Sequence, residues 1–178
     1  RTVNFTIPAN GTRAVFQNNQ QQIRIQTGTV AGQIILTPSF VTEGGINLTP
    51  TTPPALMMSV TQSAPRLLSV QLSSKTASVI TLLVTGYATN RSVTQMDFQF
   101  APVVDENVTT SRISANVDAS FIAWYNSVQS TQFGSLFTAT VPFTVAGDTV
   151  NVTGATETIK SISVTLTNRL GASPARTI

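Results

Sequence analysis

Apolar and polar residues alternate with a period of two along most of the chain, which is typical of β-strands covered on one face. In "QQIRIQT", residues 21–27, Ile23 and Ile25 share one face while Arg24 takes the other, so we expect a strand that is wet on one side. Two later strands are expected to bury three alternating apolar residues each: Met96, Phe98 and Phe100 in one, and Ile162, Val164 and Leu166 in the other.

Strand-like segments follow one another closely, separated by turns rich in Gly, Pro and Asn. The first six are "TVNFTI", "TRAVFQ", "QQIRIQT", "GQIILTPSF", "GINLT" and "ALMMSVT". The next six are "LLSVQLS", "ASVITLLVTGYA", "VTQMDFQFAP", "TSRISANV", "SLFTATVPFTV" and "TIKSISVTLTN". Because helical segments do not alternate with these strands, the pattern predicts an all-β chain of antiparallel, immunoglobulin-like sandwiches.

We predict two consecutive units, with residues 1–63 forming a small β-sandwich and residues 64–178 a larger immunoglobulin-like one. The stretch "QSAP", residues 62–65, marks the boundary because Pro65 interrupts a continuous ladder. An alternative boundary is "TPTTPP", residues 49–54. The first unit is short against the roughly 100 residues typical of the fold, so either it is a reduced sandwich or strands preceding Arg1 complete it.

One segment, "DASFIAWYNSVQS", has helical spacing and holds the only Trp of the chain. The residues at i, i+3, i+4 and i+7 are Phe121, Trp124, Tyr125 and Val128. This spacing predicts a helix near residues 119–129, with Asp118 as its N-cap and Gly134 shortly beyond its end. A helix of this length is marginal in water, so we expect it to dock on the second unit and bury most of Trp124.

The docked helix has two interpretations. It either caps an open end or edge of the second sandwich or supplies a surface for a ligand or a partner. In the second case the chain is a carbohydrate-binding module in which Trp124, Tyr125 or Tyr87 stacks against sugar rings. Carbohydrate stacking requires exposed ring faces, whereas the helical spacing predicts covered ones.

The composition excludes much catalytic chemistry. The chain contains neither Cys nor His, which removes disulfides, thiolate and imidazole metal sites, and the Ser-His-Asp triad. Only 10% of residues are charged, against roughly 25% in ordinary soluble domains, which fits secreted and cell-surface modules. The net charge of +3 comes from basic residues that stand singly, so a nucleic-acid footprint is not expected.

The remaining candidates for chemistry are weak. Asp105 and Glu106 are the only clustered acids, and adjacent residues of an extended chain point to opposite sides, which disfavours a glycosidase. Their loop could donate oxygen ligands to Ca²⁺. However, Ca²⁺ requires six to eight oxygen ligands, and the chain has no D-x-D-x-D-G-like spacing to supply them. "SSK", residues 73–75, has the composition of a Ser-Lys dyad and is interpreted as a turn. We therefore expect no enzyme activity and no cofactor.

Two further features concern the compartment. The longest apolar run, "VITLLV" at residues 79–84, has the length of a buried strand, so membrane insertion is not expected. The chain begins at Arg1, which we interpret as the start of a mature or excised piece. Six glycosylation sequons occur, at Asn4, Asn10, Asn47, Asn90, Asn107 and Asn151; they arise easily by chance in a chain rich in Asn, Thr and Ser, and so give little support to a eukaryotic secretory origin.

Several segments together resemble a known group of proteins. "FTIPANGTRAVF", "IQTGTVAGQIILTPSF", "ASFIAWYNS", "FGSLFTATVPFTVAGD" and "ISVTLTNRLGAS" are similar to paired β modules near the C-termini of large secreted proteins of soil acidobacteria. The resemblance spans nearly the whole chain and supplies no active site. It implies an extracellular, bacterial, multidomain parent in which this piece is structural or adhesive. The expected partners are other domains of that parent, with a polysaccharide or cell-surface component as the second expected class.

Overall fold

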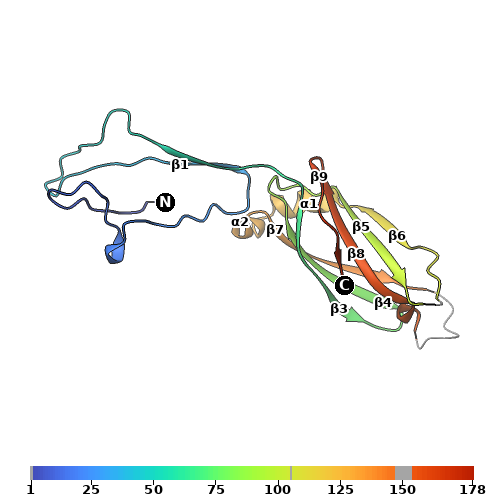
Figure 1. Ribbon diagram of the computed structural model, residues 1–178. Helices are drawn as coiled ribbons and strands as arrows, with labels where there is room; N and C mark the ends of the chain where they lie inside the picture. The colour runs from blue at the N-terminus through green and yellow to red at the C-terminus, as the bar shows by residue number, and fades with distance from the viewer. Residues whose placement is uncertain (1, 105, 147–153) are drawn as a thin grey trace.

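The computed structural model describes residues 2–104, 106–146 and 154–178, which form ten strands in three antiparallel sheets. The all-β prediction is therefore confirmed. Figure 1 shows a long, narrow projection beside a compact two-sheet part. We call residues 2–62 the arm and the described residues from Ser63 onward the body.

The arm contains one two-stranded sheet, made of β1 (Gly32–Leu36) and β2 (Leu56–Val60) in antiparallel register. Otherwise the arm is held by isolated bridges, such as Thr6 with Val15, and contains a short 3₁₀ turn, η1 (Gln17–Asn19). Residues 21–27 are not in a strand, and Ile23 and Ile25 are both exposed. The prediction of a strand here, with one face buried and one face in solvent, is therefore wrong. In the described part of the chain, no strand lies beside the backbone of residues 21–27 to pair with it.

The arm does not contain the two packed sheets of the small sandwich expected over residues 1–63. All of residues 2–62 are described, and none of them is buried; among the described residues the first buried one is Pro65. A sandwich requires a second sheet to cover the apolar face of the first. The arm has one two-stranded sheet, and no second sheet among the described residues covers it.

The first sheet of the body has the order β3 (Arg66–Lys75), β4 (Val79–Tyr87), β7 (Leu136–Thr144). "SSK" lies inside β3, which corrects its interpretation as a turn. The ladder between β3 and β4 continues through two register shifts, at Leu67/Ser69 and Leu72/Ser74, and so keeps these residues extended.

The second sheet has the order β10 (Arg176–Thr177), β8 (Ile159–Asn168), β5 (Gln95–Pro102), β6 (Arg112–Asn116). A two-residue strand, β9 (Gly171–Ala172), also pairs with β8, which follows the 3₁₀ turn η2 (Ala155–Thr158). The expected faces are confirmed, since Met96, Phe98, Phe100, Ile162, Val164 and Leu166 are all buried.

The two sheets of the body face each other across one core. The ring of Phe143 in β7 lies 4.8 Å from that of Phe98 and 5.2 Å from that of Phe100, both in β5, in edge-to-face contacts. Each fully buried side chain of this kind contributes roughly 1.5–3 kcal/mol. The body is therefore closed by its own residues, unlike the arm.

Two short helices, α1 (Asp118–Asn126) and α2 (Ser130–Phe133), join β6 to β7. The predicted helix is thus present but ends early, and Val128 is 78% exposed instead of lying on the packed face. The reason is local: the Ser127 hydroxyl donates to the Trp124 carbonyl at 2.6 Å, and Ser127 itself is extended. Asp118 is the first helical residue, not the N-cap, which is Val117.

Among the described residues, no helix is long and apolar enough to cross a membrane.

Candidate functional site

The helical connection carries the aromatic side chains that the sequence singles out. Tyr125 is 5% exposed, and its hydroxyl donates to the Ser135 carbonyl at 2.8 Å. The Arg91 guanidinium lies 5.4 Å from the centre of the Tyr125 ring and donates to the Tyr125 carbonyl and to Ser130 Oγ. Burial raises the pKa of Tyr125 to about 12. In this structure the ring of Tyr125 is therefore part of the packing under the helices.

Trp124 is partly buried, and its indole Nε1 donates to the Leu136 carbonyl at 3.4 Å. Its ring stacks on Phe133, with centroids 6.4 Å apart and an angle of 24° between planes. Phe133 is 52% exposed, so the pair presents an aromatic edge to solvent. The helical spacing of α1 did not indicate Phe133, because Phe133 lies in α2.

Tyr87, at the end of β4, is also partly buried. It is the register partner of Leu136, whose carbonyl accepts the Trp124 indole. The start of β7 therefore brings Tyr87 and Trp124 to the same residue, and Phe133 lies shortly before it. The use of Trp124, Tyr125 or Tyr87 in ligand binding stays a prediction.

The same end of the body holds the arm. Ser135 donates from Oγ to the Thr29 carbonyl at 2.7 Å, and its amide donates to Thr29 Oγ1 at 3.1 Å. The Ala31 amide donates to the Thr89 carbonyl at 2.7 Å, and the Ser63 amide donates to Thr89 Oγ1 at 2.9 Å. The segment of the arm that leads into β1 is thus fixed to the helical end of the body through Thr29 and Ala31, and the Ser63–Thr89 bond lies within the body at the same end.

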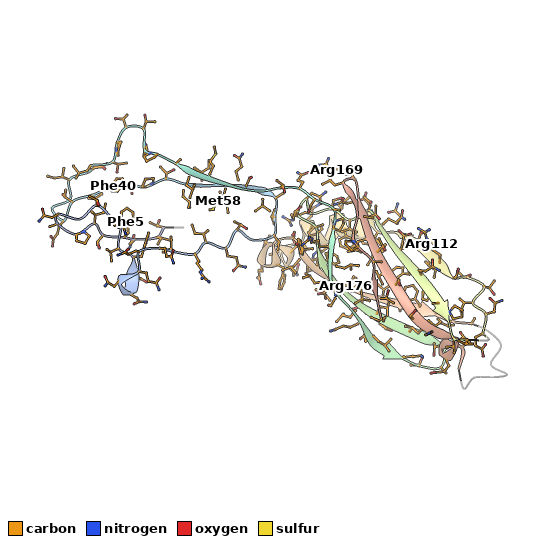
Figure 2. The ribbon with its side chains drawn as sticks, in the orientation of Figure 1. Phe5, Phe40, Met58, Arg112, Arg169 and Arg176 are labelled. Atoms are coloured by element: carbon orange, nitrogen blue, oxygen red, sulfur yellow. The ribbon has the colours of Figure 1, made fainter. Side chains whose placement is uncertain are left out.

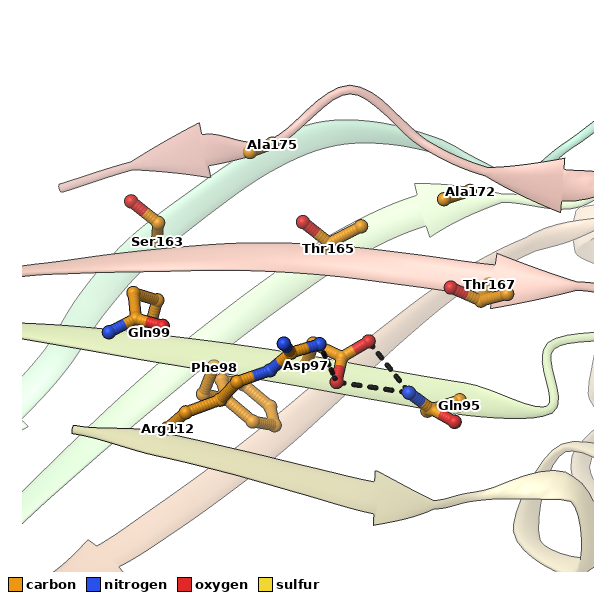
Figure 3. A pocket seen from close by; sticks show the side chains of 10 residues that line it. All are labelled: Gln95, Asp97, Phe98, Gln99, Arg112, Ser163, Thr165, Thr167, Ala172 and Ala175. Carbon is orange, nitrogen blue, oxygen red and sulfur yellow. Dashed lines mark hydrogen bonds and ion pairs between the residues drawn. The ribbon is translucent and has the colours of Figure 1, made fainter. Parts of the chain in front are cut away.

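The outer face of the second sheet carries a shallow polar hollow of about 610 Å³ (Figure 3). Its centre is Asp97, which accepts hydrogen bonds from Gln95, Arg112 and Ser114. The bond from Ser114 is the main cause that holds the pKa of Asp97 below its ordinary value. Ser163, Thr165 and Thr167 of β8 continue the lining as a row of hydroxyl groups.

These contacts limit the chemistry of the hollow. A carboxylate with a lowered pKa whose oxygens already accept several hydrogen bonds is a poor general base. Within the described residues, no group of three or more acidic side chains gathers to hold a metal ion. Asp105 lies outside the described residues, so the calcium hypothesis for the loop of Asp105 and Glu106 stays a prediction. The hollow is suited to polar recognition by hydroxyl and amide groups.

Comparison of the chain with protein-family models gave no match, and comparison with curated proteins gave none either.

Proposed function

We propose that the chain is a non-enzymatic structural or adhesion module of a secreted or cell-surface multidomain protein. In this proposal the body is an immunoglobulin-like sandwich that serves as a rigid base, and the arm is the part that contacts neighbouring modules. The observation that carries the proposal is the junction, where Ser135 and Thr89 bind Thr29 and Ala31 of the arm by hydrogen bonds. A projecting element whose base is fixed by hydrogen bonds is suited to connecting modules.

Two properties of the body support this role. Three antiparallel strands on one side and a larger antiparallel sheet on the other enclose a common core, as in immunoglobulin-like sandwiches. Asp97, the acid at the centre of the polar hollow, is already bound by its neighbours. Catalysis by paired carboxylates requires a second acid nearby to share the reaction, and the lining of this hollow contains none.

The junction can be tested by hydrogen exchange. Ser135→Ala removes the bond to the Thr29 carbonyl, so we expect faster exchange of the Ala31 amide while β4 and β5 stay protected. Ser114→Ala, on the far sheet, is the matched control and should leave Ala31 unchanged. If Ala31 already exchanges freely in the unmodified chain, the arm is not fixed and the proposed role fails.

The absence of activity is tested on the same protein with a panel of polysaccharides and peptides. We expect no turnover. Turnover that disappears in Asp97→Asn but persists in Ser163→Ala, a neighbouring change in the same hollow, would replace the structural role with an enzymatic one.

A carbohydrate-binding module is a second candidate, favoured by the partly exposed stack of Trp124 and Phe133. Sugar rings bind to such aromatic edges by stacking. Because Trp124 is the only Trp, its fluorescence reports on this position alone. We expect soluble glucans or xylans to shift its emission, and Phe133→Ala to abolish the shift while Val128→Ala does not. Emission unchanged by every glycan would exclude this site.

A further inference from the structure

The arm exposes far more surface than a folded part of a protein ordinarily does. A folded monomer of this mass, 18.9 kDa, exposes about 8,300 Å², whereas this chain exposes 12193 Å². Since the body is closed around its own core, we attribute the difference, about 3,900 Å², to the arm. It is several times the ~800 Å² that each partner contributes to an ordinary interface.

We propose that the arm forms one layer of a two-layer β-structure, and that the arm of a second copy of this chain supplies the other layer. This inference rests on the proposed role as a module that connects to neighbours. It names the partner of the arm as the same chain.

The sheet of β1 and β2 carries apolar residues on both faces, and Gln33 and Ser59 lie on the face of Ile35 and Met57. Ile35 and Met57 are register partners on one face and are 57% and 65% exposed. Ile34 and Met58 are partners on the other face, where they are only partly buried. A two-stranded sheet is marginally stable alone, so it requires cover on at least one of these faces.

The edges of this sheet are also open. Among the described residues, β1 pairs only with β2, and neither strand contains a charged residue or a proline. Charged side chains and prolines are the usual means of preventing a strand edge from pairing with another chain. Their absence from both strands leaves the edges free to extend the sheet.

The charge of the arm permits contact between two copies. Its described charged residues are Arg13, Arg24 and Glu43, and all three lie outside β1 and β2. Two arms can therefore approach along these strands with little repulsion between like charges. In a two-fold dimer the same patch meets itself, so a face that is apolar and uncharged is self-complementary.

The remainder of the arm is also incompletely filled. Phe5 contacts Phe16 and Phe40, with ring centres 6.0 and 5.8 Å apart, and this cluster is the only aromatic contact within the arm. The residues that follow Phe16 in the sequence, Gln20, Gln21, Gln22 and Arg24, line a hollow of about 850 Å³. Figure 2 shows Phe5 and Phe40 at the far end of the arm and Met58 along it. A second layer would cover this length.

The test is the mass of the full chain in solution, measured by light scattering over a range of concentrations. We expect twice the monomer mass for the unmodified chain. Met57→Lys places an unpaired charge in the proposed interface and should weaken the dimer roughly tenfold or more. Leu72→Lys is the matched control, because Leu72 is similarly exposed on β3 of the body, and it should leave the mass unchanged.

Single cysteines give an independent readout, because the chain has none of its own. Ser59→Cys in β2 should form a disulfide between two copies, whereas Ser74→Cys in β3 should not. A chain that remains monomeric, a dimer that Met57→Lys and Leu72→Lys affect equally, or open-ended aggregates would each overturn the proposal. The exchange and turnover assays, made on monomeric Met57→Lys, test the structural role separately.

Discussion

The arm and the body are made from the same kinds of residue, yet only the body buries them. β4 alternates between partly and fully buried positions along its whole length, whereas β1, with a similar apolar content, has no buried residue. Leu82 in β4 is completely covered, and Leu56 in β2 is 61% exposed. The difference shows that alternation of apolar residues provides a face, and that a second sheet is what converts that face into a core.

The two regions also differ in how many separate segments of the chain pack together to form them. The body joins strands from distant parts of the chain, since β5 lies between β6 and β8, and the Phe98 and Phe143 rings join the two sheets. The arm relies on one two-stranded sheet and the cluster around Phe5. We therefore expect the arm to open at a much lower free energy than the body.

The largest effect is expected from matched leucine truncations. Leu82→Ala leaves a cavity in the closed core and should lower the free energy of unfolding by about 2–5 kcal/mol. Leu56→Ala removes an exposed side chain and should change it by less than about 0.5 kcal/mol when the chain is monomeric. Urea unfolding at low protein concentration measures both.

If Leu82→Ala and Leu56→Ala lower the free energy of unfolding equally, the contrast between arm and body is wrong. If Leu56→Ala becomes costly only as the protein concentration rises, the contrast is sharpened, because the missing cover is then a second chain.

The strands of the body could be predicted from the sequence because their own alternation matches their environment. The segments "ASVITLLVTGYA" and "TIKSISVTLTN" contain β4 and β8. In the arm, "GQIILTPSF" and "ALMMSVT" contain β1 and β2, but the other predicted segments do not form strands. Ile23 and Ile25 have the alternation of a strand, but a strand also requires a hydrogen-bonding neighbour, and the spacing of apolar residues carries no information about that neighbour.

The candidate site was predicted in part. The helical spacing found Phe121 and Tyr125, which are buried, and Trp124, which is partly buried. It extended the helix to Val128 because the periodicity does not register a serine side chain that binds the carbonyl of the last turn. Long-range contacts, such as that of Ser135 with the arm, have no local signal in the sequence.

The second prediction tests the closure of the body at high pH. Burial raises the pKa of Tyr125 to about 12 from an ordinary value near 10, so its contribution to stability is complete below pH 10. As the pH rises from 10 to 12, the unfolded chain ionises first, and about 2–3 kcal/mol should be lost. Tyr125→Phe should remove this part of the decline. Unfolding measured against pH, with Tyr87→Phe as control, checks the assignment; equal slopes in all three proteins would contradict it.

The third prediction compares two strand glycines. A Cβ at Gly86 in β4 would lie 2.6 Å from the Arg66 carbonyl oxygen, so Gly86→Ala should cost about 1–3 kcal/mol. A Cβ at Gly32 in β1 meets nothing within 4 Å, so Gly32→Ala should be neutral or slightly stabilising. Thermal unfolding distinguishes them. A large cost at Gly32 in the monomer would show that the arm is already packed closely.

The smallest effect is expected on the outer face of the body, where Asp97 tests whether its polar contacts are also fixed. The pKa of Asp97 is lowered chiefly by the bond from Ser114, so the stabilisation is present above about pH 4 and is lost as the pH falls through the lowered value. Ser114→Ala should cost about 0.5–1.5 kcal/mol at neutral pH and less in acid. Ser163→Ala, in the same hollow but without a bond to Asp97, is the control. A cost that does not change with pH would mean that Ser114 acts by packing, and that the polar face is as loosely held as the arm.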